Sequence, residues 1–237
     1  MSSPALPLPA PLADPTPSAP PVSAYPAHGE QIPAWHVRSG AYRARFARSR
    51  VELEAIQRLR YRVFNLELGE GLAASRATGR DDDGYDERCH HLLVSHEPDG
   101  LAVGTYRLAT LELAALGGDF YSAQEFDLSG LPPRTLAGGV ELGRACIAAA
   151  HRGRQVLALL WQGIAAYAAH NRKRFLFGCA SLPGDLAPAA GALDAALRAA
   201  GAIDPALPVR PRPGFEAPAG APGAAPLGID ALPPLVR

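Results

Sequence analysis

The distribution of proline limits where this chain of 237 residues can form a packed domain. Residues 1–33 contain ten prolines and only two charged residues. Proline fixes φ and has no backbone N–H, so such a segment builds neither a helix nor a strand ladder. Residues 205–234 are again rich in proline, glycine and alanine. We therefore expect a disordered proline- and alanine-rich tail over 1–39, a folded domain over 40–204, and a proline- and glycine-rich C-terminal segment over 205–237.

Within the expected domain, the hydrophobic pattern switches between the periods of strands and helices. Tyr42, Ala44 and Phe46 alternate with arginines, which is typical of a half-buried strand. Ser49 and Glu52 then have the spacing of a capping box, which opens a helix. The helix is expected to end at or just before Gly69, and its apolar stripe consists of Ile56, Leu59, Val63 and Leu66.

The rest of the domain continues this alternation. A polar loop over 70–88 precedes a hairpin, whose strands we expect at 91–94 and 101–108 around the turn 97–100. A loop over 117–137 is long enough to suggest a function. The remaining expected elements are a strand over 140–147, a helix over 153–170, a buried strand over 175–181 and a helix over 187–200. This order predicts an α+β fold, in which a mainly antiparallel sheet opens into one βαβ unit.

Charge and composition exclude several functional classes. The formal net charge is zero, with 23 basic and 23 acidic residues, so no global field favours nucleic acid. No apolar run approaches the roughly 20 residues of a membrane span, and we see no secretory signal. We expect a cytoplasmic protein and leave peripheral contact with the inner face of the membrane open.

The three cysteines predict neither a disulfide framework nor a metal site. They are an odd number without a close pair, and none has a partner at zinc spacing. Cys89, His90 and His91 are adjacent in sequence, but on a strand the two histidines point to opposite faces. We therefore expect no bound metal.

The helix expected at residue 153 begins with arginines on both sides of a glycine. Exposed N–H groups and the positive end of the helix dipole favour an anion there. Arg152 and Arg154 are able to contact a phosphate in a bidentate manner, and Gly153 has no side chain to hold it away. The alternative is a charged helix start without a ligand.

The strand expected over 140–147 contains charged residues among apolar ones. Regular alternation places Glu141 and Arg144 on opposite faces. A glutamate in a cleft beside a helix N-terminus is a candidate general base. Alternatively, the two residues form a buried ion pair that sets the strand register. A bulge at Gly143 would change which residues share a face.

Two further groups of polar residues leave alternatives open. Arg60, Phe64 and Glu67 share one side of the first helix, so Arg60 either points inward or forms a surface ion pair. A group of aspartates crowds the loop before the hairpin and suits either an ammonium ligand or a solvated loop. These are Asp81, Asp82, Asp83 and Asp86.

Taken together, nine ordered blocks between residues 42 and 183 resemble the L-ornithine N-alpha-acyltransferases of bacterial ornithine-lipid biosynthesis. The blocks are Arg60–Gly69, Arg80–Asp86, Cys89–Leu93, Val103–Leu108, Phe120–Ser122, Glu125–Leu128, Glu141–Arg144, Leu160–Ile164 and Phe177–Ser181. The resemblance implies a GNAT-like fold, related to the acyl-homoserine lactone synthases. It also implies transfer of a 3-hydroxyacyl chain from acyl carrier protein to the alpha-amino group of L-ornithine, which gives lyso-ornithine lipid.

The resemblance also implies roles for individual residues. The implied substrate-binding residues are Arg60, Phe64, Asp83, Asp86 and Arg107. The implied catalytic residues are Glu141 and Arg144. The implied phosphopantetheine site consists of Arg152, Gly153 and Arg154. No cofactor is implied, because the donor is a 3-hydroxyacyl-phosphopantetheine on acyl carrier protein.

The implied reaction starts with Glu141, which helps, directly or through water, to remove a proton from the ornithine ammonium. The amine then attacks the thioester carbonyl, and backbone N–H groups stabilise the oxyanion. The family continues past a segment like Leu232–Arg237, which implies a sheet that is incomplete at its C-terminal edge. Two other functions stay open. The first is an N-acyltransferase for another amino acid or an acyl-homoserine-lactone-type signal synthase, and the second is a truncated non-catalytic module that binds acyl carrier protein.

Overall fold

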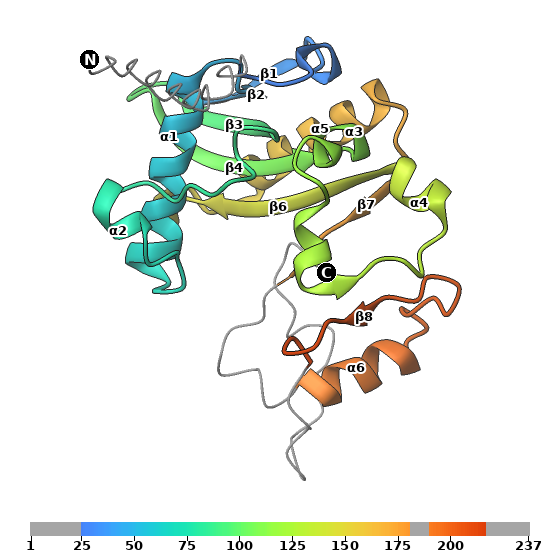
Figure 1. Cartoon of the computed structure of the whole chain (residues 1–237). Helices are drawn as coiled ribbons and strands as arrows, with labels where there is room; N and C mark the ends of the chain where they lie inside the picture. Colours follow the sequence, from blue (N-terminus) through green and yellow to red (C-terminus); the bar gives the residue numbers. More distant parts are fainter. Residues whose placement is uncertain (1–24, 181–189, 217–237) are drawn as a thin grey trace, which may run out of the picture.

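The computed structural model describes residues 25–180 and 190–216. Six strands form one mixed sheet in the order β1-β2-β3-β4-β6-β7 (Figure 1). Their bounds are β1 His36–Ser39, β2 Tyr42–Phe46, β3 His90–His96, β4 Leu101–Ala109, β6 Gly139–Ile147 and β7 Phe175–Phe177. Neighbouring strands are antiparallel, except for the parallel pair β6 and β7. The predicted α+β architecture with one βαβ unit is therefore confirmed.

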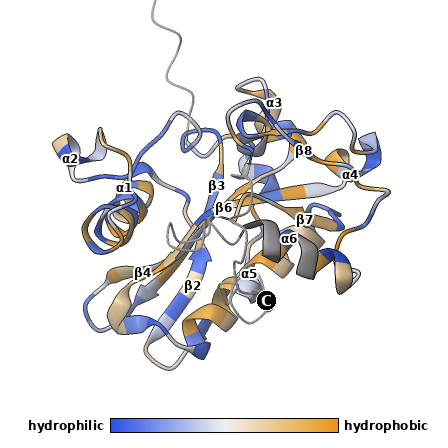
Figure 2. Cartoon of the chain, turned by 90° about the horizontal axis from the view of Figure 1, so that it is seen from below, coloured by the Kyte–Doolittle hydropathy of each residue, from blue (hydrophilic) through white to orange (hydrophobic). Residues whose placement is uncertain are grey.

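Two helices cover the two faces of the sheet, α1 (Arg50–Arg60) and α5 (Arg154–His170). Successive side chains of β3 point to opposite faces, so Leu92 packs in the core beside α5 and Leu93 packs in the core beside α1. In Figure 2, α5 is largely coloured as hydrophobic, consistent with its burial against the sheet. None of the described helices has both the length and the apolar character that crossing a membrane requires.

Helix α1 begins as predicted but continues differently. Ser49 Oγ accepts a hydrogen bond from Glu52 N at 3.4 Å, as in a capping box. After Arg60 the chain forms a π-helical turn, η2 (Tyr61–Glu67). The wider i→i+5 turn rotates the residues that follow, and Leu66, predicted to be buried, is 65% exposed. The expected stripe is therefore correct up to Val63 and wrong at Leu66.

The folded region starts before residue 40, where the sequence predicted its boundary. Strand β1 forms the edge of the sheet and pairs with β2. Ile32 is buried in the core beside α5, and Val37 packs against that core. No proline interrupts residues 34–39, so this short stretch is free to form a ladder. The expected tail is therefore shorter than 1–39, and residues 1–24 lie outside the described residues.

The C-terminal part of the described chain also differs from expectation. Strand β7 is shorter than the predicted strand over 175–181, and its side chains are not buried, because β6 is its only described neighbour. Strand β8 (Arg210–Pro211) pairs with β5 (Phe126–Asp127), which brings residues after 205 onto the loop over 117–137. The predicted last helix corresponds to α6 (Ala190–Ala199). Residues 217–237, including the segment expected to lie before a missing sheet edge, lie outside the described residues.

Six short helices complete the described fold. They are η1 Gly29–Gln31, α2 Ser75–Thr78, α3 Leu111–Ala115, η3 Tyr121–Gln124, α4 Pro133–Ala137 and η4 Ala149–His151. Two of them position the candidate site. Helix η3 lies within the long predicted loop, and η4 leads from β6 into α5.

Candidate active site

A β-bulge interrupts β6 next to β4. Thr105 pairs with Cys146. Two residues further along β4, Arg107 pairs with Gly143, which lies three residues back along β6. Strand β6 therefore has one extra residue at this point, so regular alternation does not hold across it.

The extra residue brings two predicted site residues onto one face of the sheet. Arg144 has a φ of +48°, in the left-handed region that few non-glycine residues adopt. Leu142 and Ala145 both pack beside α5, so Arg144 between them points to the other face, as Glu141 does. The regular alternation that we expected, with Glu141 and Arg144 on opposite faces, is thus wrong, and the bulge considered at Gly143 is present.

A cleft of about 710 Å³ lies where β6 and β7 separate. The two strands pair only from Gly139 to Glu141 of β6. Beyond them, a Cβ at Gly178 would lie 2.1 Å from Leu142 O, so glycine is required where the chain leaves β7. Residues from the sheet, η2, η3, α5 and the segment after β7 line the cleft, among them Glu141, Arg144, Phe64, Tyr121, Trp161 and Cys179.

Arg60 points inward and is fully buried in a network of carboxylates. Its Nε lies 2.9 Å from Asp81 Oδ1, and its two Nη atoms lie 2.9 and 2.6 Å from the oxygens of Asp86. Gln57 Nε2 donates a further hydrogen bond to Asp86 Oδ2 at 3.0 Å. Because its oxygens are engaged and only 1% of its surface is exposed, Asp86 cannot receive a substrate ammonium without breaking this network.

Asp83 connects two more arginines to the same network. Arg107 Nη1 lies 2.7 and 2.8 Å from the two oxygens of Asp83 and 3.2 Å from Asp86 Oδ1. Arg144 Nη2 lies 3.3 Å from Asp83 Oδ2, and its guanidinium stands over the Phe64 ring. Burial disfavours the charge of Asp83, but the Arg107 guanidinium outweighs it and holds the pKa of that carboxyl below its usual range.

The network therefore balances three aspartates against three arginines, those at 60, 107 and 144. Burial also opposes the charge of Asp86, yet Arg60 and His91 hold its pKa well below the usual range. The cluster contributes no net charge that would attract an ammonium ion. Asp83, whose side chain is 15% exposed, is its most accessible carboxylate.

Glu141 is held by backbone groups. Its Oε1 accepts a hydrogen bond from Ser122 N at 2.6 Å, and its Oε2 accepts one from Tyr121 N at 3.0 Å. The carboxylate therefore lies at the start of η3, and 6% of the surface of Glu141 is exposed. Within the described residues no ion pair joins Glu141 to Arg144, so the alternative of a buried Glu–Arg pair is wrong.

The start of α5 is open, with Gly153 at its N-cap. No atom lies within 4 Å of the position that a Cβ on Gly153 would take. Arg152 turns away and forms an ion pair with Glu67 Oε1 of η2 at 2.5 Å. Arg154 is exposed and has no ion-pair or hydrogen-bond partner in the part of the chain that the structure describes. Only Arg154 of this pair therefore has a guanidinium that is free for a ligand.

The two adjacent histidines point to opposite faces, as predicted. His90 Nδ1 lies 2.7 Å from the Tyr167 hydroxyl on α5, and His91 Nε2 lies 3.1 Å from Asp86 O on the other face. Burial lowers the pKa of each to about 4. Across residues 25–180 and 190–216, no group of three His, Cys, Asp or Glu side chains is arranged to hold a metal ion.

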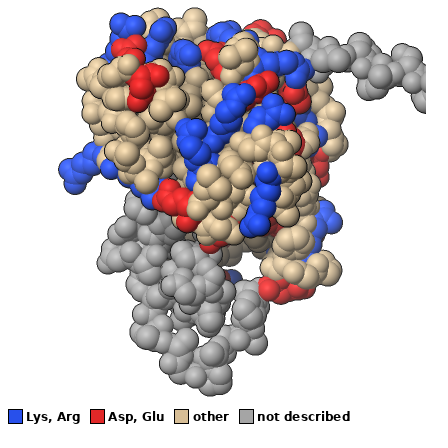
Figure 3. Space-filling view, turned by 90° about the vertical axis from the view of Figure 1, so that its left-hand side faces the viewer, with Lys and Arg blue, Asp and Glu red and all other residues tan. Residues whose placement is uncertain are grey.

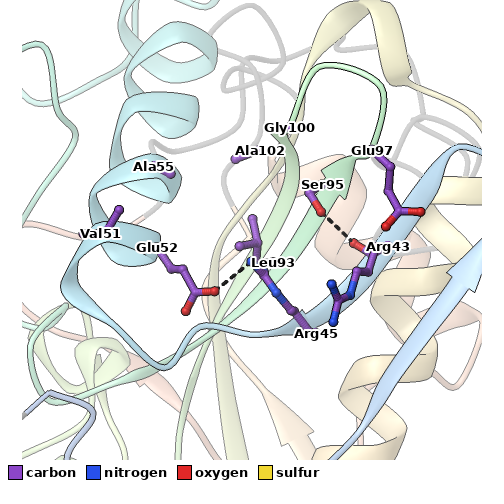
Figure 4. Close-up of a pocket in the computed structure, with 10 residues that line it drawn as sticks. All are labelled: Arg43, Arg45, Val51, Glu52, Ala55, Leu93, Ser95, Glu97, Gly100 and Ala102. Carbon is purple, nitrogen blue, oxygen red and sulfur yellow. Dashed lines mark hydrogen bonds and ion pairs between the residues drawn. The ribbon is translucent and has the colours of Figure 1, made fainter.

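A second cavity of about 350 Å³ lies between α1 and the sheet, away from all predicted site residues (Figure 4). Arg43 and Arg45 project into it from β2. Arg45 forms an ion pair with Glu52 at 2.7 Å, and the lining also includes Glu97. The charges of this cavity are therefore largely balanced.

The sequence did not indicate several residues of the site. The backbone donors to Glu141, at Tyr121 and Ser122, lie in the long loop that was expected to have a function, but nothing local indicated their target. Asp81 was one of four crowded aspartates without a distinguishing signal. Glu125 was noted only as the first residue of the block Glu125–Leu128 that resembles the acyltransferases, although it lines the cleft.

Known proteins similar to this chain agree with the architecture. Residues 59–162 match the family model described as the acetyltransferase (GNAT) domain. The chain is 42% identical over 154 residues to the L-ornithine N(alpha)-acyltransferase of Agrobacterium fabrum, a match that covers 62% of this chain and 53% of the relative. It is 40% identical over 166 residues to that of Brucella abortus, covering 66% and 58%.

The L-ornithine N(alpha)-acyltransferase of Rhodobacter capsulatus is 36% identical over 152 residues, covering 61% of this chain and 58% of the relative. The chain thus spans little more than half the length of these relatives. Among solved structures, the AHL synthase LasI is 18% identical, with a TM-score of 0.41, over 58% of this chain and 71% of that one. That overlap is too low to assign residues. By its sequence, the chain is similar to L-ornithine N(alpha)-acyltransferases over about three fifths of its length, and residues 59–162 match the acetyltransferase (GNAT) domain.

Proposed function

We propose that this protein is an N-acyltransferase that moves a 3-hydroxyacyl chain from acyl carrier protein to the alpha-amino group of L-ornithine. The observation that carries the proposal is the 36–42% identity to L-ornithine N(alpha)-acyltransferases over 147–166 residues. The cleft beside β6 supports it, because a buried glutamate and an arginine line the same opening. Both proposed substrates are water-soluble, so the reaction takes place in the cytoplasm, and the lipid product leaves toward the inner membrane face.

In the proposed reaction the alpha-amino group enters the cleft beside Glu141. The carboxylate accepts a proton from the ammonium, directly or through one water. The free amine attacks the thioester carbonyl and the carbon–sulfur bond breaks. The sulfur leaves on the phosphopantetheine arm as a thiol, because it takes up the second proton that the attacking nitrogen loses. The new bond is the amide of lyso-ornithine lipid.

The backbone of β6 supplies the groups that stabilise the transition state in this proposal. Beyond Glu141, the edge of β6 toward β7 has no paired strand among the described residues. Its N–H groups are available to the thioester arm and to the oxyanion that develops at the carbonyl. Phe64, Arg107 and Arg144 line the cleft in this proposal. Behind them, Asp83 and Asp86 form ion pairs that hold the two arginines and the buried Arg60 in place.

The carrier protein delivers its phosphate to the start of α5 in the same proposal. Gly153 leaves the backbone N–H groups accessible, and Arg154 offers an unpaired guanidinium. Arg152 contributes after it releases Glu67. On the side of the molecule that carries α1 and α2, basic and acidic side chains are interspersed, so docking depends on local charges rather than a uniform field (Figure 3).

The test is to incubate the purified chain with 3-hydroxyacyl carrier protein and a panel of amino acids, and to identify products by mass spectrometry. An amide of ornithine is the expected product. If the product is an amide of another amino acid, or a lactone, the acceptor is not ornithine. Carrier binding without any product would refute acyl transfer.

A further inference from the structure

Glu125 presents a carboxylate to the cleft from a rigid position. It follows η3, and its N–H donates to Ser122 O at 3.2 Å. Its carbonyl accepts a hydrogen bond from Arg212 N at 2.7 Å, which ties it to the segment around β8. The half-buried side chain lines the cleft together with Tyr121 and Cys179. Backbone hydrogen bonds on both sides therefore fix the part of the chain from which this carboxylate extends.

The charge of Glu125 is not balanced by the protein. Within the described residues, no lysine, arginine or histidine forms an ion pair with it, in contrast to Asp81, Asp83 and Asp86. Glu141 is engaged by backbone N–H groups, and the remaining acidic residue of the cleft, Glu70, is exposed at its rim. Glu125 is thus the half-buried carboxylate whose charge is left for a ligand.

Two neutral side chains lie beside this carboxylate. The Tyr121 hydroxyl and the Cys179 thiol lie beside it. Burial, and secondly the Glu125 charge, raise the pKa of Cys179 to about 11 and raise that of Tyr121, so both stay neutral donors.

The two glutamates are associated with opposite ends of η3. Glu141 binds the N–H of Ser122 at the start of η3, and Glu125 follows three residues later. A 3₁₀ helix rises about 2.0 Å per residue, so these two points lie about 6 Å apart along its axis. Five single bonds separate the two nitrogens of extended ornithine, a span of about 6 Å, so a molecule of this length reaches from one end of η3 to the other.

We infer that Glu125 binds the distal ammonium of a diamino acid whose alpha-amino group is acylated beside Glu141. This inference rests on the proposed function and names the residue that selects its acceptor. It replaces Asp83 and Asp86 in that role, because arginines already neutralise those aspartates.

The test compares L-ornithine with L-norvaline, which is ornithine without the distal amine, at a fixed saturating concentration of 3-hydroxyacyl carrier protein. Glu125→Gln is expected to raise the KM for ornithine roughly 10- to 100-fold with little change in kcat, since a charge-assisted hydrogen bond is lost. The kinetics with norvaline should not change, and they report that the variant is folded. Glu112→Gln, an exposed residue paired with Lys173 outside the cleft, is the matched control.

Calorimetric binding of ornithine in the absence of donor separates this inference from the proposed acyl transfer. Ornithine that binds wild type and not Glu125→Gln, without any product, would support the site and refute the transfer. If Glu125→Gln does not fold, Glu125→Asp is used, and it should weaken ornithine binding severalfold while norvaline is unaffected. An unchanged ornithine-to-norvaline preference in either variant, or no ornithine binding to wild type, would overturn the inference.

Discussion

At the scale of single residues, Glu141 has two candidate roles, as an anchor of η3 and as a general base. Its carboxylate anchors the start of η3 through two backbone N–H groups, and it also lines the cleft. An anchor needs acceptor oxygens, and a base needs a carboxylate that takes up a proton. The amide Glu141→Gln keeps one acceptor and loses the basicity.

If Glu141 is the base, Glu141→Gln should lower turnover by roughly 10²- to 10⁴-fold and change donor binding only modestly. The measurements are single-turnover kinetics, carrier-protein titration and thermal unfolding of the same preparation. Turnover close to wild type in a folded variant would leave Glu141 with the anchoring duty alone.

Arg144 offers a second test at this scale, because its φ of +48° disfavours any side chain. Arg144→Gly and Arg144→Ala both remove the guanidinium that contacts Asp83. They differ in backbone preference, so the glycine variant should be more stable by about 1 kcal/mol in the free energy of unfolding. Denaturant unfolding of the two variants measures this difference. A more stable alanine variant would contradict the left-handed conformation at the bulge.

At the scale of elements, α5 has charged residues at both ends but a different environment at each. Its start is open beside Gly153, and Arg154 has no described partner. Arg172 and Arg174 follow its other end, where cations favour the helix dipole. The two ends therefore provide a matched pair for testing the proposed phosphate site.

Arg152→Ala combined with Arg154→Ala should weaken acyl-carrier binding and flatten its salt dependence, because screening shortens the Debye length from about 10 Å at 0.1 M to 3 Å at 1 M. Of the single variants, Arg154→Ala should have the larger effect, since Arg152 is paired with Glu67. Titration of carrier protein at several salt concentrations is the measurement. Arg172→Ala with Arg174→Ala is the control.

Equal losses from the double variants at the two ends of α5 would mean that general attraction, and not a site, draws the carrier protein. Identical affinities and salt slopes in wild type and the first double variant would remove the phosphate site from the proposal. Ornithine binding should be unaffected in either double variant, because none of the four arginines lines the cleft.

At the scale of the whole molecule, buried ionisable groups make stability depend on pH. His90 and His91 have pKa values near 4 in the folded chain, compared with about 6.5 when unfolded. Well above pH 6.5 both histidines are neutral in the folded and the unfolded chain, so their ionisation does not change the free energy of unfolding. As the pH falls from 6.5 to 4, only the unfolded chain takes up these protons, and stability is lost by up to about 1.4 kcal/mol per pH unit for each histidine.

The aspartates act in the same direction at lower pH. The pKa values of Asp83 and Asp86 are lowered in the folded state, so their contribution is present above the unfolded value of about 3.9 and is lost as the pH falls below it. Urea unfolding between pH 8 and pH 3 should therefore show two successive losses. His90→Gln, on the face of the sheet away from the aspartates, should reduce the first and leave the second, and a flat profile down to pH 4 would contradict the burial of neutral histidines.

Features that depend on neighbouring residues were determined by the sequence itself. Alternation marked β2, the capping box marked the start of α1, and the turn before Gly100 marked the hairpin, because each follows from local backbone geometry. Glu141 and Arg144 were recognised as charged residues within an apolar strand, and the aspartates were recognised as a crowded group in one loop. The opposite faces of His90 and His91 also followed from the strand period alone.

Only the tertiary structure decided which of these side chains meet. Arg60 finds Asp81 and Asp86 across more than twenty residues, and no periodicity relates them. The bulge that turns Arg144 toward Asp83 depends on β4 pairing with β6, and the π-helical turn that exposes Leu66 breaks the period of α1. Register and helix phase depend on contacts with distant strands, which each single stretch of sequence leaves open.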